Sequence, residues 1–172
     1  DPVRGITNLS SGKMGFAIAR AAREAGAEVT LVAGPVSLPT PRGVQRFNVR
    51  SALEMQQAVQ AQVEMADVFI STAAVADWRV AHTSEQKIKK DGKGKMPELT
   101  WVENPDILAQ VAALERSLRG ELFCVGFAAE SHDLIAHAKA KRERKKIPLM
   151  VGNIGADTFG SDDNALWLID AH

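Results

Sequence analysis

The sequence is poor in the features that define several large classes of protein. Its 172 residues include one cysteine, so no disulfide can form within the chain. Cys124 stands in the apolar run 122–125, where a buried, inert thiol is favoured over a nucleophile. No run approaches the roughly 18 apolar residues that span a bilayer, and residues 1–4 lack the apolar stretch of a signal peptide. We therefore expect a soluble, cytoplasmic protein with no membrane segment.

An excess of charge of one sign is also missing. Lys and Arg number 21, Asp and Glu number 21, and the formal net charge is zero. The basic excess typical of nucleic-acid-binding proteins is absent, so we expect no nucleic-acid partner. Any binding of phosphate must come from local clusters of charge. The hydrophobic content of 45% suits one globular domain, which we expect to span residues 1–172.

Two common phosphate-binding motifs are absent. A P-loop would need glycine at position 7 and Ser or Thr at position 14, where the chain has Thr7 and Met14. The G-x-G-x-x-G pattern is missing, and a strand that would carry an acidic ribose ligand ends instead in Ala33-Gly34. A P-loop hydrolase and a standard NAD enzyme are therefore disfavoured. An NAD(P)-binding reductase on a Rossmann-like sheet remains the alternative function.

Segments of helical pattern alternate with short apolar runs along the chain. Helices are expected at 14–25, 51–65, 105–118 and 132–146, and strands at 29–34, 68–73, 122–127, 148–152 and 165–169. This alternation predicts an α/β fold with a doubly wound, mostly parallel sheet, a Rossmann-like three-layer sandwich. Because no strand precedes the turn at 10–15, the first strand of the fold is expected to lie outside this chain.

The turn at 10–15 is the first candidate site. It opens the first helix, which Ser11 is expected to cap and Gly26 to end, so free backbone N–H groups and the helix dipole meet there. These features indicate an anion site, although an ordinary serine cap with a flexible glycine fits the same residues. A second candidate is the lysine-rich segment 77–97, which we expect to be a mobile flap. Its run Lys87 to Lys90 fits either a cover over a polyphosphate or a solvated surface.

Other candidates follow the ends of predicted strands and helices. Asp77 comes after small residues that would let a flat ring approach the backbone, and it could hold a metal or a ribose. Asp106 lies near a helix start, where it could be a cap or a ligand contact, as could Asn104. Phe127 fits either a base-stacking or a core position. Lys141 is four residues from Lys145 on one helical face, so both either serve a site or face solvent.

Six short motifs occur in one order and spacing: Asp-Pro-Val-Arg (1–4), Ser-Ser-Gly-Lys-Met-Gly (10–15), Ala-Ala-Val-Ala-Asp (73–77), Lys-Ile-Lys-Lys (87–90), Asn-Pro-Asp (104–106) and Gly-Phe-Ala-Ala-Glu (126–130). Together they closely resemble phosphopantothenoylcysteine synthetase of the bacterial, CTP-using type. The resemblance implies a ligase of coenzyme A biosynthesis that joins 4'-phosphopantothenate to L-cysteine through an acyl-cytidylate, releasing CMP and pyrophosphate. It also implies Mg²⁺, a homodimer and, in many bacteria, fusion to a flavin-dependent decarboxylase. Residue types alone do not distinguish CTP from ATP.

The resemblance also implies roles for particular residues. Asn8 would hold the acyl intermediate, and Lys87 would contact the triphosphate, so both are expected to be catalytic. Arg4, Asn8 and Asn153 would contact phosphopantothenate, and Asp77 would bind the metal. The expected nucleotide-binding set is Ser10, Ser11, Gly12, Met14, Gly15, Ala73, Asp77, Lys87, Asn104, Pro105, Asp106, Phe127, Lys141 and Lys145.

Overall fold

The structure is a computed structural model that describes residues 1–8, 10–89, 92, 98–130, 132–154 and 164–171. In chain order its elements are α1 (Lys13–Glu24), β1 (Thr30–Ala33), β2 (Gln45–Asn48), α2 (Ala52–Val63), β3 (Val68–Ser71), β4 (Trp78–Val80), β5 (Trp101–Glu103), α3 (Ile107–Ala112), α4 (Glu115–Leu118), β6 (Phe123–Glu130), α5 (Leu134–Lys145), β7 (Leu149–Ile154) and β8 (Trp167–Ile169).

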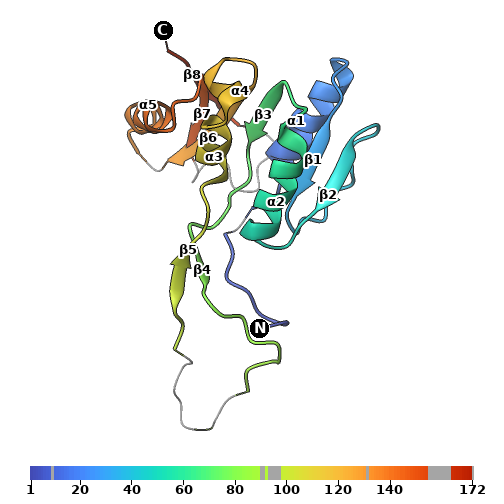
Figure 1. The fold of residues 1–172 in the computed structure, drawn as a ribbon, viewed down its shortest axis with the longest axis vertical. Helices are drawn as coiled ribbons and strands as arrows, with labels where there is room; N and C mark the ends of the chain where they lie inside the picture. The colour runs from blue at the N-terminus through green and yellow to red at the C-terminus, as the bar shows by residue number, and fades with distance from the viewer. Residues whose placement is uncertain (9, 90–91, 93–97, 131, 155–163, 172) are drawn as a thin grey trace.

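The strands form two parallel-dominated sheets and one ribbon. The larger sheet has the order β3-β6-β7-β8, in which only β8 runs antiparallel to its neighbour. The strands β1 and β2 form a separate parallel pair, and β4 and β5 form an antiparallel ribbon. Figure 1 shows α1 and α2 beside the β1–β2 pair, α3 to α5 around the larger sheet, and the ribbon projecting from both. The predicted α/β class is confirmed, but in the described residues the sheet is divided, with no ladder between β1 and β3.

The hydrophobic core lies around β6 and β7. Ala128, Met150 and Cys124 are at most 1% exposed, and α3 and α5 pack their buried residues against them. Burial raises the pKa of the Cys124 thiol, which the Ser117 hydroxyl partly offsets. This environment supports the inert interpretation of the thiol.

Several predicted elements differ from the structure. The predicted helix at 105–118 is two helices, because the backbone of Leu114, between α3 and α4, is in an extended conformation. The strands β2, β4 and β5 were not predicted, since they are three or four residues long and have no continuous apolar run. Part of the predicted flap at 77–97 is therefore strand β4. Residues 90, 91 and 93–97 of the flap lie outside the described residues, and its mobility stays a prediction, as does the strand expected outside the chain.

Candidate functional site

One large cavity lies at the carboxyl ends of the parallel strands. Its volume is about 2980 Å³, whereas a site for one small molecule usually has about 300–1,000 Å³. The cavity also reaches Leu31 and Val32 of β1, so it extends into the space between the two parallel ladders. Every residue of the predicted site lines this cavity except Lys87, whose neighbours Ile88 and Lys89 do. The structure thus brings the predicted residues to one place, and their individual roles stay predictions.

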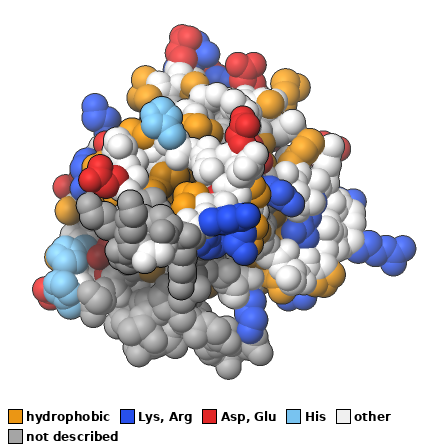
Figure 2. Space-filling model, turned by 90° about the horizontal axis from the view of Figure 1, so that it is seen from below, with side chains coloured by type: hydrophobic (Ala, Val, Ile, Leu, Met, Phe, Trp, Pro, Cys, Tyr) orange, Lys and Arg blue, Asp and Glu red, His pale blue; other side chains and the backbone are white. Residues whose placement is uncertain are grey.

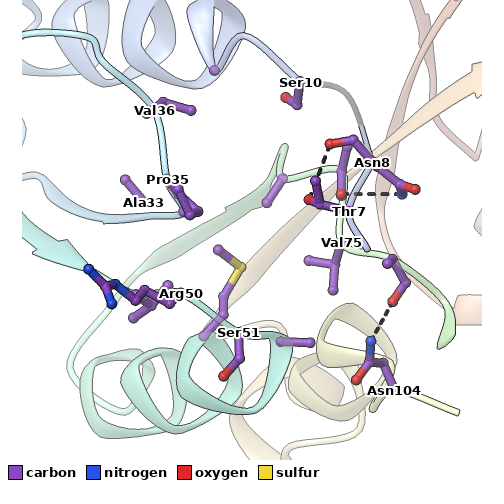
Figure 3. A pocket seen from close by; sticks show the side chains of 18 of the residues that line it. Thr7, Asn8, Ser10, Ala33, Pro35, Val36, Arg50, Ser51, Val75 and Asn104 are labelled. Carbon is purple, nitrogen blue, oxygen red and sulfur yellow. Dashed lines mark hydrogen bonds between the residues drawn. The ribbon is translucent and has the colours of Figure 1, made fainter. Parts of the chain in front are cut away.

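The start of α1 is fitted tightly between two loops. Gly12 is the N-cap, with a positive φ of 75° and no side-chain cap. Ser11 stands one residue before this cap position, but its hydroxyl oxygen accepts the backbone N–H of Lys13, the first residue of α1, at 3.4 Å. The predicted contact of Ser11 with the helix start is therefore present, although Ser11 is not the N-cap residue. A Cβ on Gly12 would lie 3.1 Å from Val36 Cγ1, and one on Gly15 would lie 2.8 Å from Thr72 Oγ1. Figure 3 shows Val36 and Ser10 on the two sides of the cavity below this helix end.

The first turn of α1 contains no acidic residue. Its N–H groups and its dipole are therefore not opposed by a carboxylate of the same turn, which is the arrangement that binds phosphate at a helix start. The contact of Ser11 with the Lys13 N–H is compatible with such a site, and the anion site at residues 10–15 stays a prediction.

Two asparagines hold the segment that follows β3. Asn104 donates its side-chain N–H to the Ala76 carbonyl at 2.8 Å and its backbone N–H to the Asp77 carbonyl at 2.7 Å. From the other side Asn8 donates to the Ala74 carbonyl at 3.4 Å, and Figure 3 shows both bonds at the cavity. The Asn104 amide oxygen also accepts from Arg79 at 3.3 Å. Asn104 therefore positions residues 76 and 77, a role that the sequence did not suggest, and Asn8 positions residue 74.

Asp77 is the acidic side chain that this segment exposes to the cavity. Within the part of the chain that the structure describes, it forms no hydrogen bond or ion pair, and no group of three or more His, Cys, Asp or Glu residues is placed to hold a metal. One free carboxylate fits Mg²⁺ that is held mainly by substrate phosphates and water. A metal site built from protein ligands alone does not fit these residues.

Three elements bring the predicted base and ribose contacts together. Asp106 caps α3 by accepting the Ala109 N–H at 3.0 Å, and its other oxygen pairs with Lys145 of α5. Lys141 donates to the Phe127 carbonyl of β6 at 3.1 Å. Phe127 is half-buried and lines the cavity, so part of its ring is available to a ligand. Asp106 is thus both a helix cap and a cavity residue, and the two interpretations of this carboxylate are compatible.

The charges in this cluster shift each other's ionisation. Partial burial alone would raise the pKa of the Asp106 carboxyl, but the hydrogen bonds from Lys145 and Ala109 hold it below its ordinary value. Burial lowers the pKa of the Lys141 ammonium, and the neighbouring Lys145 charge lowers it further. The lowered pKa favours the charged form of Asp106, which can accept a hydrogen bond from a sugar hydroxyl.

Arg4 reaches the flap. It pairs with Asp1, and one of its guanidinium nitrogens donates to the Ile88 carbonyl at 2.7 Å. The Arg4 side chain is 59% exposed and borders the cavity, so it is accessible to a ligand. Its contact with phosphopantothenate stays a prediction. Viewed from the ribbon end, basic and hydrophobic side chains lie side by side in the middle of this face (Figure 2).

The sequence interpretation missed one wall of the cavity. The loop 34–41 lines it, and Arg46 holds this loop by donating to the carbonyls of Leu38 at 2.7 Å and Val36 at 3.3 Å. Arg46 also lies over the Phe16 ring at 4.9 Å. The sequence did contain an indication of this wall. A proline-rich loop directly after a parallel strand lies at the edge where such sheets bind ligands.

The chain belongs to the family described as DFP, the DNA/pantothenate metabolism flavoprotein C-terminal domain, which matches over residues 1–172. It is 52% identical over 171 residues to the coenzyme A biosynthesis bifunctional protein CoaBC of Vibrio vulnificus strain YJ016, and 51% identical over 172 residues to that of Escherichia coli K12. Each match covers 98% of this chain and 42% of the relative. The chain thus spans less than half the length of these curated relatives.

Solved structures agree with this relationship. The C-terminal domain of a CoaBC protein matches with a TM-score of 0.77 and 34% identity, covering 100% of this chain and 80% of that one. A Cab2 mutant in complex with phosphopantothenate-cysteine matches with a TM-score of 0.77 at 14% identity, over 98% of this chain and 71% of that one, which shows the shared fold alone. The resemblance and the Rossmann-like α/β fold class predicted from the sequence are confirmed. These relatives lend no support to the NAD(P) reductase alternative. Among the described residues, no helix has the length and apolar character needed to cross a membrane.

Proposed function

We propose that this domain is a phosphopantothenate–cysteine ligase that uses CTP and Mg²⁺. The observation that carries the proposal is the single cavity into which the start of α1, the 73–77 segment and the Asp106–Lys145 cluster all open. A helix start suited to anions, an exposed carboxylate and half-buried lysines are what a triphosphate and its metal require. The relatives named CoaBC support the same activity.

The proposed reaction has two steps. The carboxylate of 4'-phosphopantothenate attacks the α-phosphate of CTP, which forms the acyl-cytidylate and releases pyrophosphate. The amine of cysteine then attacks the acyl carbon and loses a proton, and CMP leaves. The first step brings anions together, so cations that neutralise the developing charge are the main catalytic requirement. Asp77 would help to hold Mg²⁺, which would supply part of this positive charge.

A pyrophosphate-release assay tests the proposal. The protein is mixed with 4'-phosphopantothenate, L-cysteine, Mg²⁺ and each of the four nucleoside triphosphates in turn. We expect release with CTP that depends on phosphopantothenate, and phosphopantothenoylcysteine as the product. The absence of release with all four nucleotides would contradict the ligase assignment, and release with ATP alone would contradict the choice of CTP.

We also propose that the active form is a homodimer joined through the β4–β5 ribbon. Trp78 pairs with Glu103, and Val80 pairs with Trp101, so both tryptophans lie on one face of the ribbon. They are 55% and 45% exposed. A two-stranded ribbon alone is marginally stable, and exposed tryptophans are typical of the centre of an interface. A second copy that covers this face would also bring its own flap to the shared surface.

Removing the two ribbon tryptophans is expected to separate the dimer. If each is an interface anchor, its loss costs about 2 kcal/mol, or a roughly 30-fold weaker dimer. Light scattering after size exclusion should therefore show a Trp78→Ser/Trp101→Ser variant as a monomer, with ligase activity reduced in parallel. Trp167→Ser, in which the altered side chain is 38% exposed on β8, is the matched control and should remain dimeric. A double variant with unchanged mass would contradict this interface.

The relatives also support a proposal about the position of this domain in a longer protein. Because the chain matches 42% of the length of CoaBC proteins, we propose that it is the ligase half of a bifunctional protein whose other half is a flavin-dependent decarboxylase. Coenzyme A synthesis uses phosphorylated, water-soluble intermediates, so the cytoplasm is the proposed location.

A further inference from the structure

A buried carboxylate at the start of the chain holds the flap. The Asp1 side chain is 2% exposed, although it belongs to a segment that is otherwise at the surface. Its Oδ1 atom accepts the backbone N–H groups of Val3 at 3.1 Å and Arg4 at 3.0 Å. Its Oδ2 atom accepts the Nε–H of Arg4 at 3.0 Å and the backbone N–H of Ile88 at 3.2 Å. A buried carboxylate with this many donors is fixed in position.

The contact with Ile88 is made from two sides. Asp1 accepts the Ile88 N–H, while Arg4 donates to the Ile88 carbonyl at 2.7 Å and pairs with Asp1 through the same guanidinium nitrogen. The result is a closed ring of Asp1, Arg4 and the peptide backbone at Ile88, separated by 87 residues in sequence. We call this ring the latch.

The latch lies beside the lysines of the flap. Lys87 and Lys89 flank Ile88 in the chain, and Lys89 lines the cavity. The other end of the same N-terminal segment carries Asn8, which is bonded to the Ala74 carbonyl. Residues 1–8 therefore connect the flap to the segment after β3 through side-chain hydrogen bonds at both ends.

We propose that Asp1 is a positioning residue that acts through Arg4 and Ile88 to fix Lys87 and Lys89 over the phosphates. This inference rests on the proposed ligase function for its consequence in catalysis, but the latch itself is a property of the fold. Asp1 touches neither substrate nor metal in this scheme. Its charge is needed because it holds both the guanidinium and the peptide N–H, whereas Arg4 needs its planar fork to reach Asp1 and the carbonyl together.

Amide hydrogen exchange tests the latch without any substrate. In Asp1→Asn we expect the Ile88 amide to exchange about 10-fold faster or more, because its acceptor is weakened, while the Met150 amide in β7 stays protected. Arg4→Lys should have the same effect, since a lysine cannot make the paired contact. Asp67→Asn removes an exposed carboxylate away from the cavity and should leave Ile88 unchanged. Unchanged exchange at Ile88 in Asp1→Asn, with a folded core, would overturn the latch.

A double-variant comparison tests its role in catalysis. We expect Asp1→Asn to lower kcat/KM for CTP about 10-fold in pyrophosphate release, and to have no further effect when Lys87 and Lys89 are both changed to Gln. An equal loss in that background would show that Asp1 does not act through the flap lysines and would overturn the positioning role. If Ile88 exchange rises but no nucleotide supports pyrophosphate release, the latch stands and the proposed function fails.

Discussion

Replacing Lys87 with Gln is expected to slow pyrophosphate release by roughly 10²- to 10³-fold while the fold stays intact. The reason is the loss of one positive charge where negative charge develops on the transferring phosphate. In the structure Lys87 lies just outside the cavity, next to Ile88 and Lys89, which line it. Its role therefore requires the Lys87 side chain to turn toward the cavity beside the latched Ile88, or a second subunit to present it, when the nucleotide binds. Single-turnover pyrophosphate release with CTP is the measurement.

Two further lysine variants make this result specific. Lys139→Gln removes an equivalent charge from an exposed position of α5 that does not line the cavity, and we expect wild-type rates. Lys89→Gln tests the neighbour that lines the cavity in this structure. A normal rate for Lys87→Gln together with a large loss for Lys89→Gln would show that Lys89, and not Lys87, supplies the catalytic positive charge.

The Asn8→Asp variant is expected to make the acyl-cytidylate and then to process it about 10²-fold more slowly. The wild-type amide donates to the Ala74 carbonyl, whereas a carboxylate would face that carbonyl without a proton to share. The same negative charge would repel the phosphate of the intermediate. Because the acyl-cytidylate is already reactive, the second step depends mainly on its position relative to the amine.

Rapid quenching with quantification of acyl-cytidylate and phosphopantothenoylcysteine checks this result. Asn48→Asp adds the same charge at an exposed position on β2 that does not border the cavity, and it should leave both amounts unchanged. Formation of product at the normal rate by Asn8→Asp, with no accumulated intermediate, would refute the role of Asn8.

The sequence predicted the main elements and most of the cavity because the signals were local. The helix expected at 14–25 and the helix expected at 132–146 agree with α1 and α5 within two residues at each end. Their strong helix formers, and for α1 the glycine at position 26 that follows it, decide this without help from the rest of the fold. The motif residues lie at strand and helix ends, and parallel strands bring their carboxyl ends to one edge.

The features that the sequence did not predict depend on contacts between distant segments. Strand β2 contains Gln45 and Arg46, and it is a strand because it pairs with β1, not because of an apolar run. The ribbon exists through the pairing of residues 78–80 with 101–103. The bonds of Asp1 and Arg4 to Ile88 join positions more than 80 residues apart, and no spacing within either segment indicates them.

The close packing at the start of α1 restricts which substitutions this sequence can accept. A methyl group on residue 15 would lie 2.8 Å from the hydroxyl oxygen of Thr72, so alanine at position 15 requires the Thr72 side chain to shift or to be replaced. We therefore expect the two positions to change together in descendants of this sequence, for a steric reason that is independent of any ligand.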